Sequence, residues 1–398
     1  MRLRIGLISH LIRDYNLGCS ALAISNILLM DEVFEKYNIV VEYIVILAEP
    51  KDKICLEDYT SLDEYTKNSF SYRTYPRLKP ILKNPFLLKK TKAFDGCDYV
   101  IDLCGGDGYT DNYGLIRLLA ESLPVIVCKM KNVQCFFAPQ TIGPFNSFIG
   151  KFIAQRTLRN LQTIFVRDQS SFECCEKLGL GNSTLQVIDV AFVLPFTKQR
   201  MKNGKFNVGI NVSGLLYNGG YNCKNYFKLA FSYKDFISRL IETLSECDGI
   251  QIHLIPHVID DEEGLDDDYS VCRLLNQRYD RVILPDKFNN ATQAKSYISA
   301  MDLFSGARMH STIGAVSGGV PVIPVAYSRK FNGLYDTLEY PYYIDAKAKQ
   351  TVDEAIQTFM HYMNCIEELR KGIGNAQRIY NSRLENYKNK LTQIMDLH

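Results

Sequence analysis

An arginine, a histidine and a lysine follow two apolar runs in the last third of the chain. Arg308 and His310 come shortly after residues 301–304 and open a segment with helical character, and Lys330 follows residues 320–326. A helix start favours anions, because its unpaired N–H groups and its dipole both present positive charge. Two fixed cations and one titratable group predict a site for a small substrate that carries carboxylate and phosphate. A structural interpretation stays open, in which Arg308 and His310 cap the helix and pair with surface acids and Lys330 is an exposed helix-start lysine.

Other polar motifs also follow apolar runs, and their order along the chain is informative. They are Asn16-Leu17-Gly18, the glycine-rich stretch 105–109 after the run 99–103, the stretch Phe-Ala-Pro-Gln-Thr-Ile-Gly-Pro-Phe at 137–145, and Arg167 after the run 163–166 with Asp189 beyond it. Together with the block at 306–330, this set resembles the polysaccharide pyruvyltransferase family over residues 10–340 or so.

The resemblance implies a reaction and assigns roles within it. Members of the family move the enolpyruvyl unit of phosphoenolpyruvate onto two hydroxyls of one sugar, which leaves a cyclic pyruvate ketal and inorganic phosphate. The enol carbon must be protonated, and histidine, with an ordinary pKa of about 6.5, is the side chain best suited to this step. His310 is therefore the expected general acid. Arg308, Arg167 and Lys330 match the positive positions that would bind carboxylate and phosphate.

The remaining motifs supply turns and a second candidate catalytic group. Asp107 replaces the third glycine of the family's glycine-rich turn, and we expect it to orient or deprotonate an acceptor hydroxyl, with a turn-stabilising role as the alternative. Arg167 has a salt bridge with Asp168 or Asp189 as its alternative role. Glycine lets the backbone approach a ligand closely. The expected catalytic residues are His310, Arg308 and Asp107, and the expected substrate-binding residues are Arg167, Lys330, Arg308, Asn16, Gly18, Gly105, Gly106 and Gln140.

The elements that must position these residues alternate between strand and helix patterns, which is typical of parallel sheets with crossover helices. We expect an α/β fold of two Rossmann-like domains facing across a cleft, with ligands at the carboxyl ends of the strands. The family resemblance adds that the architecture is GT-B-like. The expected strands are 3–9, 39–47, 99–103, 125–128, 162–166 and 187–192 in the first half and 207–212, 250–255, 281–284, 301–304 and 320–325 in the second.

Domain boundaries follow from the same alternation. We predict an N-terminal domain over residues 1–196 that binds the acceptor, a polar linker over 197–206, a C-terminal domain over 207–350 that binds phosphoenolpyruvate, and a helical tail over 351–398.

Composition narrows the classes of partner. The net charge of +2 over 398 residues gives no reason to expect nucleic acid. The twelve cysteines lack zinc spacing, His253 and His257 lie in an apolar segment interrupted by Pro256, and the acidic run 260–268 reads as a solvated loop leading into a capped helix. No metal and no cofactor besides the co-substrate phosphoenolpyruvate is therefore expected. The absence of a signal-like or spanning segment predicts a cytoplasmic protein.

One basic segment suggests a membrane partner. Residues 65–94 contain no acid, and lysines and arginines alternate there with aromatic and aliphatic residues. Such a segment suits peripheral contact with an anionic bilayer, which would serve a lipid-linked oligosaccharide acceptor. The alternative is an ordinary exposed basic loop and helix.

Two other functions remain open at this stage. One is a GT-B glycosyltransferase that uses a nucleotide sugar, and the other is a non-catalytic carbohydrate-binding relative.

Overall fold

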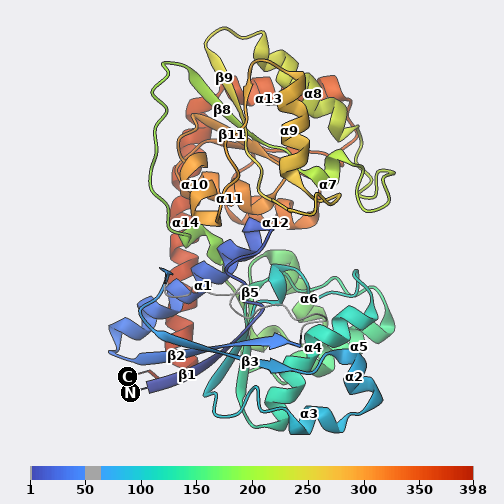
Figure 1. The fold of residues 1–398 in the computed structure, drawn as a ribbon, viewed down its shortest axis with the longest axis vertical. Helices are drawn as coiled ribbons and strands as arrows, with labels where there is room; N and C mark the ends of the chain where they lie inside the picture. Colours follow the sequence, from blue (N-terminus) through green and yellow to red (C-terminus); the bar gives the residue numbers. More distant parts are fainter. Residues whose placement is uncertain (1, 50–63, 398) are drawn as a thin grey trace. The chain divides into compact units, whose positions relative to one another are not determined.

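Two parallel β-sheets, each built from alternating strands and helices, organise the chain (Figure 1). The computed structural model describes residues 2–49 and 64–397. Contacts divide the chain into unit 1, which comprises Met1–Arg13, Leu22–Val190 and Ser382–His398, and unit 2, which comprises Asp14–Ala21 and Ala191–Asn381. The expected α/β fold of two Rossmann-like domains is confirmed.

Unit 1 contains a seven-stranded sheet in the order β3-β2-β1-β4-β5-β6-β7. Its strands are β1 (Arg2–Ile8), β2 (Val40–Ala48), β3 (Ser69–Tyr75), β4 (Tyr99–Asp102), β5 (Gln134–Gln140), β6 (Ile164–Val166) and β7 (Thr184–Gln186). The strand order reverses between β1 and β4, where Ile8 pairs with Asp102. Open parallel sheets place ligand sites at the carboxyl ends of strands near such a reversal.

The helices of unit 1 connect its strands. They are α1 (Leu17–Lys36), α2 (Leu78–Lys83), α3 (Phe86–Lys90), α4 (Leu115–Met130), α5 (Phe148–Leu158) and α6 (Gln169–Lys177), with short 3-10 helices η3 (Cys104–Gly106) and η4 (Gly181–Ser183). One core cluster joins Ile81 of α2, Leu118 of α4 and Leu158 of α5 to buried strand residues such as Val100. Helices α2, α4 and α5 therefore contribute to one core against the sheet.

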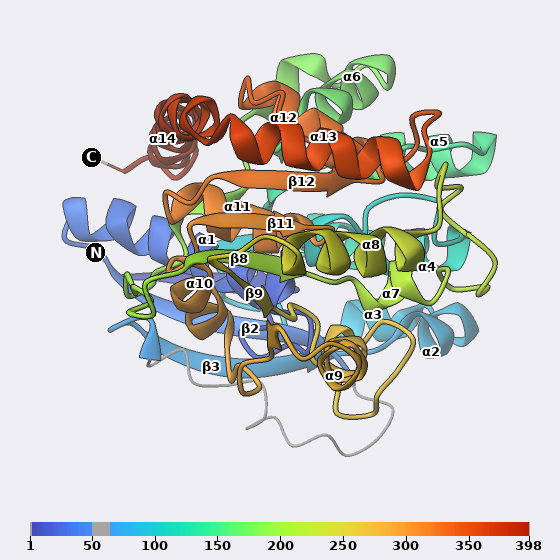
Figure 2. The ribbon, with the colours of Figure 1, turned by 90° about the horizontal axis from the view of Figure 1, so that it is seen from above.

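Unit 2 contains a six-stranded parallel sheet in the order β10-β9-β8-β11-β12-β13. Its strands are β8 (Phe206–Asn211), β9 (Ile250–Leu254), β10 (Val282–Ile283), β11 (Leu303–Gly306), β12 (Val322–Ala326) and β13 (Ile344–Asp345). Figure 2 looks across these strands, and β12, β11, β8 and β9 follow one another in the order of the sheet. The order reverses between β8 and β11, as it does between β1 and β4.

The helices of unit 2 connect these strands, and 3-10 helix η5 (Val190–Val193) precedes them. They are α7 (Gly214–Tyr217), α8 (Tyr233–Ser245), α9 (Asp268–Arg278), α10 (Ala291–Ile298), α11 (Met309–Ser317), α12 (Arg329–Thr337) and α13 (Val352–Asn364). The chain then continues into α14 (Ile366–Ile394). The first residues of α14 belong to unit 2, and its last residues belong to unit 1.

Helix α1 is long and apolar enough to cross a membrane by length and composition alone. However, 83% of its most apolar 18-residue window is buried inside the protein. Burial of that kind is typical of a core helix, because apolar residues on all sides of a helix can be covered by protein as well as by lipid.

Some expected elements were wrong. Residues 125–128 belong to helix α4, not to a strand, because a short apolar run fits a buried helix as well as a buried strand. Residues 187–192 form no strand and enter η5. Strands β3, β5, β7 and β13 were not expected, and the helical tail is two helices that meet at Cys365.

Candidate functional site

Arg308 lies at the reversal of strand order in unit 2, directly after β11. It is the N-cap residue of α11, where no side chain caps the helix. Its backbone N–H donates to the Oδ1 of Asn211, the last residue of β8, at 2.9 Å. The carboxyl ends of the two strands that flank the reversal therefore fix the start of α11.

Two carboxylates hold the Arg308 guanidinium. Its Nε donates to Asp268 at 3.1 and 3.3 Å, and its Nη2 donates to Asp268 at 2.6 Å and to Asp266 at 2.7 Å. The side chains of Arg308 and Asp268 are 11% and 0% exposed. Burial alone would lower the pKa of Arg308, but the charges of Asp268 and then Asp266 raise it above its usual value. The cation is thus paired within the protein, as the structural interpretation of the sequence allowed, although only one of its two partners, Asp266, reaches the surface.

Asp268 also fixes the loops that follow β8 and β9. Its carboxylate accepts hydrogen bonds from the backbone N–H of Gly214 at 2.8 Å and from those of His257 and Val258 at 3.1 Å each, and from Asn211 Nδ2 at 3.2 Å. The expectation of a solvated acidic loop at 260–268 is wrong for this residue, because a buried arginine and several buried N–H groups require an acceptor there.

The capped helix expected after this loop is confirmed. Asp267 is the N-cap residue of α9 and accepts from Ser270 N at 2.8 Å.

His310 packs against the start of α1. A Cβ added at Gly18 would lie 2.3 Å from the Nδ1 of His310, so only glycine leaves room for the ring. Asn16 holds this turn, because its Oδ1 accepts from Gly18 N at 3.0 Å. The backbone N–H of Leu17 donates to the carbonyl of His257 at 3.1 Å, so the turn is attached to the loop after β9.

His257 and Lys330 complete this cluster in unit 2. His257 is buried, and its pKa is lowered to about 3, first by burial and then by the charges of His310 and Arg308. Lys330, in the first turn of α12, interacts electrostatically with Asp266. Burial raises the pKa of Asp266, and the positive charges of Arg308 and Lys330 oppose that rise. Five expected site residues therefore belong to one region of unit 2, namely Arg308, His310, Lys330, Asn16 and Gly18.

Arg167 occupies a comparable position in unit 1, directly after β6. Its Nη1 donates to Asp189 at 2.7 Å, its Nε donates to Thr141 Oγ1 at 2.9 Å, and its backbone N–H donates to the carbonyl of Gln140 at 3.2 Å. Both Arg167 and Asp189 are buried. Of the two acids considered from the sequence, Asp189 is the ion-pair partner, while Asp168 caps α6 by accepting from Ser171 N.

The glycine-rich turn and Gln140 lie beside Arg167 in unit 1. Gly106 has φ +87°, and an added Cβ would lie 2.5 Å from Leu22 and 3.4 Å from Arg167 Nη1. Gln140 is buried, and its Nε2 donates to the carbonyl of Asp102 at 3.3 Å. Gly105 is exposed with φ +62°, which suits a tight turn. The structure thus brings Gly105, Gly106, Gln140 and Arg167 together in unit 1.

Asp107 follows the turn and is partly exposed. Its Oδ2 lies 3.5 Å from the hydroxyl of Tyr113.

Sequence reasoning missed Asp102, the last residue of β4. Its carboxyl is fully buried, and its pKa is raised to about 7, first by burial and then by the charge of Glu121. The backbone N–H of Cys104 donates to it at 2.8 Å. An aspartate at the carboxyl end of an apolar run was the available signal.

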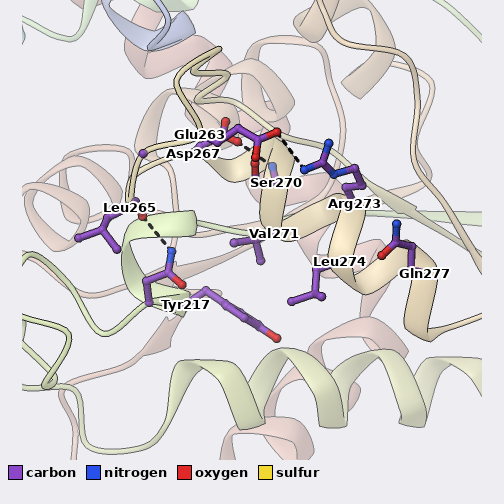
Figure 3. Close-up of a pocket in the computed structure, with 11 residues that line it drawn as sticks. Tyr217, Glu263, Leu265, Asp267, Ser270, Val271, Arg273, Leu274 and Gln277 are labelled. Carbon is purple, nitrogen blue, oxygen red and sulfur yellow. Dashed lines mark hydrogen bonds and ion pairs between the residues drawn. The ribbon is translucent and has the colours of Figure 1, made fainter.

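A separate pocket of about 520 Å³ lies between the loop 263–267 and helices α7 and α9 of unit 2 (Figure 3). Figure 3 shows Arg273 joined to Glu263, at 2.9 Å, at one side of the pocket and the Tyr217 ring at another. None of the expected site residues lines it. The pocket adjoins the candidate site through Leu265 and Asp267, whose chain neighbours Asp266 and Asp268 bind Arg308.

Metal-binding geometry is absent from the part of the chain that the structure describes. No group of three His, Cys, Asp or Glu side chains within residues 2–49 and 64–397 could hold an ion. The cysteines of these ranges are free thiols.

The sequence of the chain matches a known protein family. The model of the polysaccharide pyruvyl transferase family matches residues 16–329, which is most of the chain. No curated protein sequence matches.

Several solved structures share the fold at low sequence identity. A putative UDP-N-acetylglucosamine 2-epimerase from Listeria monocytogenes has a TM-score of 0.63 and 9% identity. The match covers 100% of this chain and 97% of the epimerase chain. S. aureus MnaA with UDP has a TM-score of 0.61 and 11% identity, with 100% and 98% covered. Anabaena HepE with UDP has a TM-score of 0.58 and 12% identity, with 100% of both chains covered. These likenesses confirm the GT-B-like fold.

Proposed function

Because the chain belongs to the polysaccharide pyruvyl transferase family, we propose that it transfers the enolpyruvyl unit of phosphoenolpyruvate to two hydroxyls of a sugar, forming a cyclic pyruvate ketal in capsular or exopolysaccharide biosynthesis. The observation that carries the proposal is the match of the family over residues 16–329, together with the cluster of His310, Arg308 and Lys330 at one edge of unit 2. The cluster contains a proton donor and cations, as the reaction requires.

Phosphoenolpyruvate binds, in this proposal, at the uncapped start of α11 and beside Lys330. Helix N-terminal N–H groups and a lysine both favour phosphate and carboxylate. Arg308 acts differently from the expectation based on the sequence. Since Asp266 and Asp268 already occupy its guanidinium, we assign it the role of holding the α11 start and His310 in position.

His310 is the general acid of the proposed reaction. It delivers a proton to the methylene carbon, the neighbouring carbon becomes electrophilic, and a sugar hydroxyl attacks it. The carbon–oxygen bond to phosphate then breaks, and the second hydroxyl closes the ketal. One of the two hydroxyl protons returns to the histidine and the other leaves with phosphate. His257 and His253 do not suit this role, because their pKa values are lowered to about 3 and about 4 by burial, so both are neutral at neutral pH.

The acceptor, in the same proposal, binds unit 1. Asp107 orients the attacking hydroxyl, or takes up its proton and passes it on. Gly105 is exposed beside it, and the buried residues Gly106, Gln140 and Arg167 support the glycine-rich turn from within unit 1. A lipid-linked oligosaccharide in the cytoplasm is the acceptor that we propose, and no metal takes part.

The direct test is incubation with phosphoenolpyruvate and a panel of galactosides, N-acetylmannosamine and glucose glycosides. We expect phosphate release that depends on one acceptor and that survives EDTA, together with a product heavier by one pyruvate ketal. Phosphate release without a ketal, or no turnover with any acceptor, would count against the proposal.

A nucleotide-sugar function is the second candidate, because the structural neighbours from S. aureus and Anabaena carry UDP. It requires that UDP bind this chain. Saturable binding of UDP with no binding of phosphoenolpyruvate would favour this alternative.

A further inference from the structure

The two most exposed large apolar side chains among the described residues lie at the starts of neighbouring helices in unit 1. Phe148, in the first turn of α5, is 85% exposed, and Ile116, in the first turn of α4, is 76% exposed. Ile149 and Phe152 on α5 are each 56% exposed. Single exposed apolar residues are common, but a group of this kind on adjacent helices marks an interaction surface.

A carboxylate clamp places these residues side by side. Asp111, in the loop before α4, accepts hydrogen bonds from the backbone N–H groups of Asn146 and Ser147, each at 2.8 Å, and from the Ser147 hydroxyl at 2.8 Å. Ser147 in turn caps α5 by accepting from Gly150 N. An added Cβ at Gly150 would lie 2.4 Å from the Asp111 carboxylate, so the contact is close. The starts of α4 and α5 are therefore held together while their apolar side chains stay in solvent.

Helix α5 adds positive charge beside this apolar group. Residues 147–166, which include all of α5, contain Lys151, Arg156 and Arg159 and no acid. All three of these cationic side chains are exposed.

The neighbouring helices α2 and α3 have the same character. Both pack against α4, and each exposes one apolar side chain to 66%, Leu82 on α2 and Phe86 on α3. Exposed lysines accompany them at positions 79, 83, 89, 90 and 92. The other apolar residues of the basic segment behave differently, because Ile81, Tyr75 and Phe94 are buried in the core. The basic segment 65–94 therefore contributes mainly charge, and α4 and α5 contribute most of the exposed apolar area.

We propose that the face formed by α2, α3, α4 and α5 of unit 1 binds an anionic lipid surface, with Phe148, Ile149, Phe152 and Ile116 entering the boundary between headgroups and acyl chains. Apolar side chains beside a field of lysine and arginine match both parts of such a surface. The same charge disfavours a second copy of this face as the occupant, because like charges would meet. The inference does not depend on the proposed function.

The chain contains no tryptophan, which allows a specific test. Phe148→Trp introduces one reporter at the centre of the face, and Val40→Trp introduces a matched reporter at another exposed site of unit 1, 59% exposed at the start of β2. With vesicles of phosphatidylcholine and phosphatidylglycerol at low salt, we expect a blue shift of Phe148→Trp fluorescence and quenching by brominated acyl chains. Val40→Trp is expected to show neither change, and pure phosphatidylcholine or high salt should abolish the signal.

Variants separate the two contributions. Replacement of Lys83, Lys89, Lys90 and Lys92 by glutamine in the otherwise wild-type protein should lower its partition coefficient onto the vesicles by roughly 100- to 1000-fold. Each cation near an anionic surface contributes about a factor of five. Phe148→Ser with Phe152→Ser should abolish sedimentation with the vesicles while the protein still melts cooperatively.

Three results would overturn the proposal. They are no partitioning of the wild type at low salt, equal quenching of both tryptophan reporters, or a blue shift of Phe148→Trp that requires no vesicles and tracks a monomer–dimer equilibrium in sedimentation velocity. The last result would assign the face to a second copy of the chain.

Discussion

Each unit places a buried arginine just beyond a strand at the carboxyl edge of its sheet, but the two arginines are held differently. Arg167 pairs with one carboxylate, that of Asp189, and with the Thr141 hydroxyl. Arg308 pairs with Asp266 and Asp268, and Asp268 also accepts hydrogen bonds from four other groups, which lie at the end of β8 and in the loops that follow β8 and β9. Arg308 is thus the centre of a network, whereas Arg167 belongs to a smaller one.

The difference shows that an arginine at the end of a strand does not have to bind a ligand. An arginine after a strand looks like an anion-binding residue in a sequence, yet a guanidinium shared by two carboxylates, one of them fully buried, has little charge left for a ligand. In unit 2 the residues beside the arginine, His310 and Lys330, are therefore the better candidates for contact with substrate. The arginine keeps the loops around them in place.

The largest effect that we expect comes from His310. His310→Gln keeps a polar side chain but cannot deliver a proton, so turnover should fall by about 10² to 10⁴ while cooperative melting is retained. His361→Gln, at an exposed histidine on α13, is the control and should leave turnover unchanged. Near-normal turnover in His310→Gln would remove unit 2 from the proton-transfer step.

Asp268→Asn tests the network directly. Loss of this charge leaves Arg308 buried with only Asp266, so we expect a loss of about 3 to 5 kcal/mol in the free energy of unfolding. Asp189→Asn, the matched change in unit 1, should destabilise the protein less, since Arg167 anchors fewer connections. Denaturant titration of the two variants measures the difference, and equal destabilisation would mean that the two arginines have equivalent structural roles.

Gly18→Ala tests the packing of His310. The added methyl group would overlap the imidazole ring, and a displacement near 1 Å is enough to lower turnover by roughly tenfold to 100-fold. Gly374→Ala, at a helical glycine with open space around it, is the control and should leave turnover unchanged. A Gly18→Ala enzyme with full activity would show that the ring position is not critical.

Asp102 gives unit 1 a pH dependence of its own. Its pKa is about 7 in the folded protein and near 3.9 when unfolded, so the folded state binds more protons between these values. Its contribution to stability is therefore fully present below about pH 4 and is lost as the pH rises through 7. The melting temperature of Asp102→Asn should exceed that of the wild type by an amount that grows from pH 5 to pH 8. For the exposed control Asp280→Asn, the difference in melting temperature from the wild type should stay constant with pH. A constant difference for Asp102→Asn as well would contradict the raised pKa.

The sequence predicts the sheets well and the network poorly, for physical reasons. Strands buried on both faces read as apolar runs, so alternation reveals most of them. It missed β5, whose sequence includes Gln134, Pro139 and Gln140, and the run at 125–128 has the composition of a buried strand inside helix α4. The acidic stretch 260–268 contains seven carboxylates, and nothing local distinguishes Asp268 from the others. Its burial depends on Arg308 and on the ends of β8 and β9, which are distant in the sequence. The contact of Gly18 with His310 is likewise tertiary.

In the proposed function, phosphoenolpyruvate binds the edge of unit 2 that contains His310 and Lys330. Titration calorimetry with phosphoenolpyruvate should show saturable binding to the wild type. Lys330→Met should weaken it by about 1.5 to 3 kcal/mol, through loss of a charge-assisted contact, while Arg329→Met, at the exposed neighbouring position, should bind as the wild type does. Unchanged affinity in a folded Lys330→Met protein, or no binding of phosphoenolpyruvate to the wild type, would contradict the account.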